Sequence, residues 1–218
     1  MATLLIRRNL LPLVLATLTG MGTSGLAAAQ VGPGTAIAQK QALESVEASF
    51  ETVRAMPRYL LMNGKDRAVT SEDFRNRFQL VAFGFTGCAD VCPTTMLEMQ
   101  QVLAALGTRA PQVQPIFITI DPERDSATVL DAYTRNFDAR ILGLTGSPEL
   151  VRRAADNFQV KFEKVQEPGA SAHVYTMDHT AGLFLLGPDG QLLAKFGYST
   201  SVSDIVARIE RWLDVAAP

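Results

Sequence analysis

Cysteine and histidine are scarce in this 218-residue sequence, which has two cysteines, Cys88 and Cys92, and two histidines, His173 and His179. The chain can therefore form at most one internal disulfide. The formal net charge is only -2 and no basic cluster is present, which argues against binding to nucleic acid. The apolar content of 47% is sufficient for one well-buried core but does not require a second domain.

Long apolar runs are also absent, because the apolar stretch at 10–18 is far shorter than the roughly 20 residues that span a bilayer. Arg7 and Arg8 precede this stretch as a basic region, and Ala27–Ala29 resembles a small-residue cleavage site. The pattern predicts an export signal over residues 1–29, either cleaved or retained as a membrane anchor. The protein is then expected in the periplasm or exported, either soluble or tethered to the outer face of the inner membrane.

Strand and helix patterns alternate through the rest of the chain. An apolar run at 80–86 precedes a helical pattern at 93–106, and a β-rich run follows at 114–120, which together predict a parallel, right-handed βαβ unit. The other predicted elements are a hairpin at 59–69 turned by Asn63-Gly64, a capping box at 70–73, helices at 126–137, 148–158 and 204–215, and strands at 140–145, 160–165, 173–177, 183–186 and 192–196.

This order of elements predicts an α/β, thioredoxin-like fold with an N-terminal β-hairpin and insertions, over residues 57–218. Residues 30–56 are predicted to form an N-terminal arm, either helical or only partly ordered. Nothing in the sequence requires an oligomer, so we expect a monomer.

Cys88 and Cys92 lie in the turn between the first strand and the helix of the βαβ unit, at the edge of the sheet where ligand sites gather. Cys92 is expected at the helix N-cap, where unpaired N–H groups and the helix dipole should lower its pKa. Because thiolates both bind soft metals and attack disulfides, the turn favours either chemistry. A structural disulfide is the third reading, although so short a loop removes little chain entropy from the unfolded state.

A third ligand is needed for a soft metal site, and a histidine is the natural candidate. A lone histidine in a loop usually bonds only to backbone, yet the two cysteines favour His179 over His173, which lies on a predicted strand. Two thiolates and one imidazole suit Cu(I), whereas a structural zinc site would take a fourth ligand. The same set could hold Cu(II) with an added water.

Several motifs in one order closely resemble the SCO/SenC family of copper-binding, thioredoxin-like assembly factors for cytochrome c oxidase, over about residues 62–215. They are Phe83–Thr86 with Cys88, Asp90–Pro93, Asp121–Asp125, Leu144–Gly146, Asp178–Thr180 and Gly187–Gly190. The resemblance implies that Cys88, Cys92 and His179 bind copper. It also implies partners: a copper donor protein, and oxidase subunit II, to whose dinuclear copper site the protein delivers copper or whose cysteines it reduces.

The sequence departs from the family at two positions beside Cys88, in the connection here called the cysteine loop (residues 85–92). Gly87 stands where the family often has histidine, and Ala89 where it often has proline. The loss of proline is expected to loosen the loop and shift its redox potential or copper affinity. The N-terminus also resembles a cleavable signal, whereas many members keep a membrane anchor.

Other residues near the motifs have weaker claims to a role. The carboxylates could tune the thiols, contact a partner or orient the histidine, but turn and cap roles are commoner for them. Methionine thioethers can hold Cu(I), but on a helix they usually fill the core. These residues are Asp90, Asp121, Asp125, Asp178, Met96, Met99 and Met177.

Two functions other than copper delivery stay open. A thiol-disulfide oxidoreductase would need only Cys88 and Cys92, although such enzymes usually separate their cysteines by two residues rather than three. A peroxiredoxin-like peroxidase is suggested by Val91–Thr94, but Ala89 stands where that family has threonine or serine. Enzymatic activity is therefore uncertain, and the primary expectation is a metal-binding assembly factor.

Overall fold

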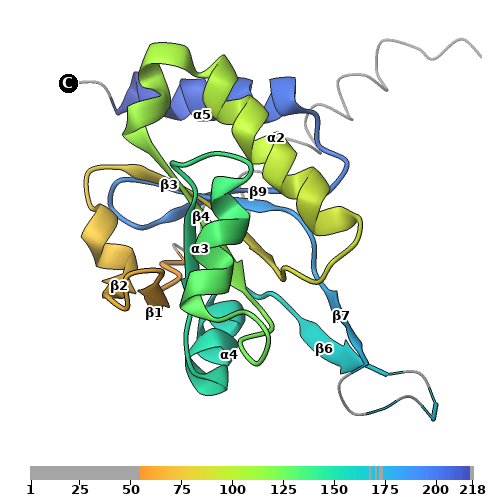
Figure 1. Ribbon diagram of the computed structural model, residues 1–218. Helices are drawn as coiled ribbons and strands as arrows, with labels where there is room; N and C mark the ends of the chain where they lie inside the picture. The colour runs from red at the N-terminus through yellow and green to blue at the C-terminus, as the bar shows by residue number, and fades with distance from the viewer. Residues whose placement is uncertain (1–54, 167, 170, 172–173, 217–218) are drawn as a thin grey trace, which may run out of the picture. The chain divides into compact units, whose positions relative to one another are not determined.

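A seven-stranded mixed sheet forms the centre of the fold (Figure 1). The computed structural model describes residues 55–166, 168–169, 171 and 174–216, all within the unit Phe50–Pro218. The strand order is β2-β1-β5-β4-β3-β8-β9. The bounds are β1 (Leu60–Asn63), β2 (Ala68–Thr70), β3 (Phe78–Gly84), β4 (Val113–Thr119), β5 (Leu142–Thr145), β8 (Leu183–Leu186) and β9 (Leu192–Phe196).

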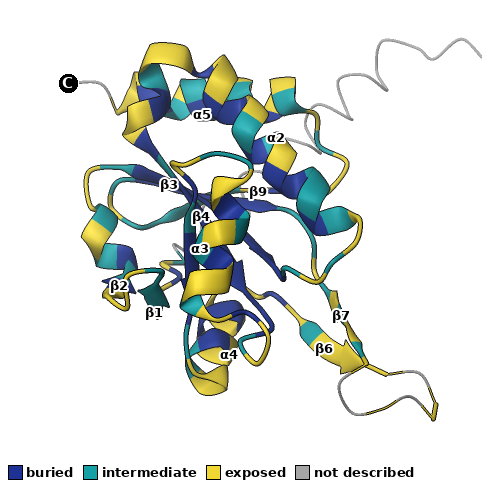
Figure 2. Ribbon diagram, in the orientation of Figure 1, coloured by how far each residue is buried: buried dark blue, intermediate teal, exposed yellow. Residues whose placement is uncertain are grey.

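The three middle strands β5, β4 and β3 run parallel, while β1, β8 and β9 add antiparallel neighbours at both sides. Every residue of β3 is buried, and so are most of β4 and all of β8. Strands covered on both faces are continuous apolar runs rather than alternating patterns, which is how these segments read in the sequence. Figure 2 shows the burial concentrated on the sheet and on the helix faces turned toward it.

Four α-helices accompany the sheet: α2 (Val91–Ala105), α3 (Ala127–Arg135), α4 (Pro148–Asn157) and α5 (Val202–Val215). Two short 3₁₀ helices, η1 (Ser71–Phe74) and η2 (Gly107–Gln112), also lie within the described residues. Helices α2 and α5 pack side by side (Figure 1). Serine side chains accept hydrogen bonds from the first-turn N–H groups of α3, α4 and α5, which explains where these helices begin.

Aromatic contacts show which helices cover which face. Phe117 of β4 stacks on Tyr133 of α3, and its ring lies beside Gly84, on the same side as Cys92. Phe83 of β3 instead packs edge-on against Phe158, at the end of α4. Because neighbouring β3 residues point to opposite faces, α2 and α3 lie on one side of the sheet and α4 on the other.

A separate two-stranded antiparallel hairpin is formed by β6 (Phe162–Val165) and β7 (Thr176–His179). Figure 1 shows it projecting away from the main sheet, and most of β6 is exposed (Figure 2). An isolated two-stranded hairpin is marginally stable in water, so its placement depends on contacts with the rest of the fold.

The predicted α/β architecture and N-terminal hairpin are confirmed, and β8 and β9 have the predicted bounds. The prediction of a two-residue turn at Asn63-Gly64 is wrong. Asn63 is the last residue of β1, and its side-chain oxygen instead accepts hydrogen bonds from the N–H groups of Lys65 and Arg67, at 2.9 and 3.2 Å. This side-chain turn holds a longer loop before β2.

The strand predicted at 173–177 is also displaced: β7 begins at Thr176 and ends at His179, because it pairs with β6 in the register Phe162–His179. His173, the predicted export signal over residues 1–29 and nearly all of the arm at 30–56 lie outside the described residues. Within the part that the structure describes, no helix is both long and apolar enough to cross a membrane.

Close packing of α3 on β5 generates a stability prediction. A Cβ atom added at Gly143 would lie 2.9 Å from Cγ of Leu130 and 3.1 Å from its carbonyl oxygen. Gly143→Ala is therefore expected to push α3 outward and lower the free energy of unfolding by about 1–3 kcal/mol, measured by urea denaturation. Gly197→Ala, where nothing lies within 4 Å of the added atom, is the control, and equal losses in both variants would contradict the packing argument.

Candidate metal centre

The two cysteines occupy the connection from β3 to α2, as predicted, but the helix begins earlier than expected. Asp90 is the N-cap residue and Val91 the first helical residue, so Cys92 is the second and Pro93 the third. Proline is tolerated there because the first four N–H groups of a helix have no partner within it. The predicted helix start at Pro93 and N-cap role of Cys92 are therefore wrong.

Cys92 lies at the bottom of the site, with 2% of its surface exposed. Its sulfur packs on the backbone of Gly84, where an added Cβ would lie only 2.8 Å away. Burial, with a smaller contribution from the neighbouring Cys88 sulfur, raises the pKa of the Cys92 thiol to about 12. The expectation that the helix start lowers the pKa of Cys92 is wrong, because desolvation outweighs the favourable N–H groups.

The N–H groups at the start of α2 lower the pKa of Cys88 instead. Its sulfur accepts a hydrogen bond from the backbone N–H of Cys92 at 3.4 Å, in the first turn of α2. Partial burial alone would raise the pKa of Cys88, but this bond and those from the N–H groups of Asp90 and Val91 together lower it. Both cysteines are free thiols, and Cys88 is the more exposed of the two.

His179 reaches the cysteines from β7, and its Nε2 atom lies 3.7 Å from Sγ of Cys92. Its Nδ1 atom lies 3.0 Å from the carbonyl oxygen of Thr180, so Nδ1 carries the proton and donates it there. Burial lowers the pKa of His179, which favours the neutral ring. This tautomer leaves the lone pair of Nε2 directed toward Cys92.

The structure thus brings together two of the predicted ligands from segments 87 residues apart, with the third beside them. Among the described residues, no three histidine, cysteine or acidic side chains are already gathered around one point as a finished metal site. The ring of Phe85 meets His179 edge-on, with 6.3 Å between ring centroids, and closes one side of the site.

A buried carboxylate holds the start of the cysteine loop. Asp125 is fully buried and accepts hydrogen bonds from the Thr86 N–H at 3.0 Å, from the Thr86 hydroxyl and from the Thr119 hydroxyl at 2.6 Å. The expectation of Asp125 as a helix cap is wrong, because Ser126 caps α3. Sequence reasoning missed Thr86 and Thr119, whose only signal was a hydroxyl at the end of each buried strand.

The residues with weaker claims to a functional role lie in different parts of the structure. Met96 and Met99 are fully buried in the core, as their helical spacing suggested, and Met177 packs partly buried against it. Asp178 is exposed. Asp121 is buried and accepts hydrogen bonds from Arg124 and from the Tyr175 hydroxyl, and Arg124 and Tyr175 also went unnoticed in the sequence.

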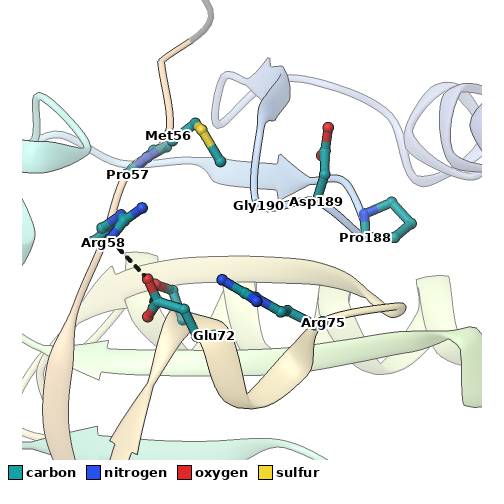
Figure 3. Close-up of a pocket in the computed structure, with 9 residues that line it drawn as sticks. Met56, Pro57, Arg58, Glu72, Arg75, Pro188, Asp189 and Gly190 are labelled. Atoms are coloured by element: carbon teal, nitrogen blue, oxygen red, sulfur yellow. Dashed lines mark hydrogen bonds and ion pairs between the residues drawn. The ribbon is translucent and has the colours of Figure 1, made fainter.

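A small cavity lies elsewhere, between the segment before β1, η1 and the β8–β9 turn (Figure 3). Its volume of about 30 Å³ holds a water molecule but not an organic substrate. Arg58 and Glu72 form an exposed ion pair at its wall, 3.2 Å apart. Its lining includes the thioether of Met56 but no thiol or imidazole, so none of the three predicted metal ligands lies there.

Comparison with curated proteins finds mitochondrial relatives of this chain. The mouse (Mus musculus) mitochondrial protein SCO2 homologue is 38% identical over 155 residues, which cover 70% of this chain and 60% of the relative. The chain therefore matches less than two thirds of that relative's length.

Solved structures show the same architecture. The copper-bound structure of ScoI from Bradyrhizobium japonicum matches with a TM-score of 0.64 and 34% identity, covering 71% of this chain and 97% of that one. Copper-bound yeast Sco1 matches with a TM-score of 0.67 and 29% identity, covering 74% and 89%. The predicted thioredoxin-like fold is thereby confirmed. The sequence model of the SCO1/SenC family matches residues 47–214, and the chain belongs to that family.

Proposed function

We propose that this protein is a copper metallochaperone that binds one copper ion through Cys88, Cys92 and His179. Copper is its cargo, Cu(I) by ligand softness and Cu(II) when an additional ligand is present. In this proposal the ion passes from a copper donor protein to the dinuclear copper site in subunit II of cytochrome c oxidase. Residues 1–29 would export the protein to the compartment where that site is assembled.

The separation of Cys92 and His179 is the observation that carries the proposal. Metal–sulfur and metal–nitrogen bonds of about 2.3 and 2.0 Å that meet at about 120° place the two ligand atoms about 3.7 Å apart. The structure has 3.7 Å between Sγ of Cys92 and Nε2 of His179. A three-coordinate site therefore needs no change in the distance between these two ligands.

The histidine is also prepared as a ligand. Metal-binding histidines usually donate their second ring N–H to a carboxylate or backbone carbonyl, which fixes the tautomer and the ring orientation. The bond from Nδ1 of His179 to the carbonyl of Thr180 has this role. Because the ring is neutral, copper does not have to displace a proton from it.

Cys88 completes the site from the exposed side. Its sulfur accepts a bond from the Cys92 N–H and also lies within hydrogen-bonding reach of the Cys92 thiol, so the two sulfurs are already close together. Its lowered pKa makes the thiolate readily available, whereas Cys92 must lose a proton that burial retains. Loading thus releases protons, and transfer to a partner starts by ligand exchange at the exposed Cys88.

Copper affinity tests the three ligands. In an anaerobic Cu(I) competition titration of the reduced chain, we expect one tight site per molecule. Cys88→Ser, Cys92→Ser and His179→Ala should each weaken it at least about 100-fold, which corresponds to about 2.8 kcal/mol. His173→Ala removes the only other histidine and should bind as the wild type does. Wild-type affinity in His179→Ala would refute the assigned ligand set.

A second candidate function is favoured by the contrast between the thiols. Cys88 is partly exposed with a lowered pKa, and Cys92 is buried with a raised one, which suits an attacking and a resolving cysteine. Such a pair would reduce a disulfide in oxidase subunit II or another exported protein through a mixed disulfide on Cys88. This activity would not need His179.

Thiol alkylation tests this asymmetry. With limiting iodoacetamide, Cys88 should be labelled first, and the midpoint of its rate increase with pH should lie below that of an ordinary cysteine, because its pKa is lowered. Cys92 should still be gaining reactivity near pH 10, since its pKa is about 12. Mass spectrometry of the single variants Cys92→Ser and Cys88→Ser separates the two profiles. Faster labelling of Cys92 would contradict this order.

A further inference from the structure

The hairpin that carries His179 lies outside the main sheet, so particular side chains must hold it against the cysteine loop. One anchor comes from α4. Arg152 lies over the ring of Phe162, at 3.7 Å from its centroid, and donates to its carbonyl oxygen at 3.2 Å. Phe162 pairs with His179, so this anchor holds the end of the hairpin that carries the histidine.

The second anchor is Arg124, in the loop that follows β4. Its Nε atom donates to the buried carboxylate of Asp121, and its Nη1 atom donates to the carbonyl oxygen of Tyr175 at 3.0 Å. The guanidinium also lies over the Tyr175 ring, at 3.8 Å from its centroid. The Tyr175 hydroxyl in turn donates to Asp121 at 2.9 Å. These three residues form a closed set of contacts, here called the Arg124 latch.

The latch also touches the segment that carries the cysteines. The Arg124 guanidinium lies 5.6 Å from the centroid of Phe85, the first residue after β3. A Cβ added at Gly87, next to Cys88, would lie 3.8 Å from Cζ of Arg124. One planar cation thus contacts both the hairpin with His179 and the loop with the thiols.

A second cation reinforces the hairpin side. Nζ of Lys164 lies 3.9 Å from the centroid of the Tyr175 ring and 2.9 Å from Oε2 of Glu123. Both Lys164 and Glu123 are exposed, so this pair contributes little by itself. Arg124 differs, since its partner Asp121 is buried and its planar fork satisfies two acceptors at once.

We infer that Arg124 is a positioning residue, which together with Asp121 and Tyr175 sets the approach of His179 to Cys92. The inference rests on the proposed copper site and concerns how its third ligand is held. Tyr175 precedes His179 by four residues, about 13 Å along a strand. Since β7 is paired with β6, holding Tyr175 at one end and Phe162 at the other restricts where His179 can lie relative to Cys92.

A double-mutant cycle on Cu(I) affinity tests this inference. Arg124→Lys keeps the charge but loses the planar fork that donates to Asp121 and to the Tyr175 carbonyl while lying over the Tyr175 ring. In the reduced full-length chain it is expected to weaken Cu(I) binding about tenfold, as loss of a ligand-orienting contact does. In the His179→Ala background the same change should have no further effect. Tyr175→Phe, which removes one hydroxyl, should show a smaller loss with the same dependence on His179.

The control variant is Arg140→Lys. Arg140 also donates two bonds to one carboxylate, that of Asp138, but it lies just before β5, at the opposite edge of the sheet from the cysteines. It should bind Cu(I) as the wild type does. Equal losses for Arg124→Lys with and without His179 would overturn the inference, since a general destabilisation acts in both backgrounds. No loss in either would overturn it too.

A measurement without copper separates this inference from the proposed function. Hydrogen exchange of the β6 and β7 amides should quicken in Arg124→Lys while the urea midpoint stays close to that of the wild type. Unchanged exchange would refute the latch even if His179 binds copper. If instead His179→Ala leaves Cu(I) affinity intact, the proposed function fails, whatever the exchange shows.

Discussion

Buried Asp125 ties together the ends of three strands at the edge where both cysteines lie. Its carboxylate accepts bonds from Thr86 after β3 and from Thr119 at the end of β4, and its backbone carbonyl accepts a bond from the Thr145 hydroxyl in β5. A fully buried charge is tolerated only when such donors satisfy it. The position of the cysteine loop, and thus of everything that Cys88 and Cys92 can reach, depends on this arrangement.

The cysteine loop places its two thiols in different physical environments. The first-turn N–H groups of α2 act on Cys88, whereas desolvation dominates at Cys92, which packs on Gly84. The Cys88 sulfur is consequently partly exposed with a lowered pKa, and the Cys92 sulfur is buried and retains its proton. For a carrier, this arrangement suits entry and exit of a soft ion from the Cys88 side, with Cys92 and His179 as the inner ligands. If the protein acts as a reductant, the same contrast would make Cys88 the attacking cysteine and Cys92 the resolving one.

Much of the fold and of the cysteine site could be predicted from the sequence. The features that could not be predicted have physical reasons for it. The fully buried strand β8 reads directly as an apolar run and has its predicted bounds, as does the partly buried β9. The cysteine turn followed from a strand, a short loop and a helical pattern. The thiol pKa values did not follow, because burial depends on what packs above Cys92 and the helix dipole alone points the other way.

The β6–β7 hairpin was harder to predict from the sequence. Residues 173–177 read as a strand by composition, but pairing with β6 displaced it to Thr176–His179 and made the histidine its last residue. The importance of Arg124 and Tyr175 could not be predicted, because their partner Asp121 lies 54 residues from Tyr175 and only the fold brings them together. Long-range polar contacts of this kind leave no periodic signal in a single sequence.

The central claim is that two thiolates and one imidazole, drawn from two distant segments, form a single copper site. X-ray absorption spectroscopy of the reduced, Cu(I)-loaded protein tests it most directly by identifying the atoms bonded to the metal. The account predicts two sulfur neighbours and one nitrogen neighbour, with the nitrogen lost in His179→Ala. A shell of sulfur alone in the wild-type protein, or a nitrogen that persists without His179, would contradict it.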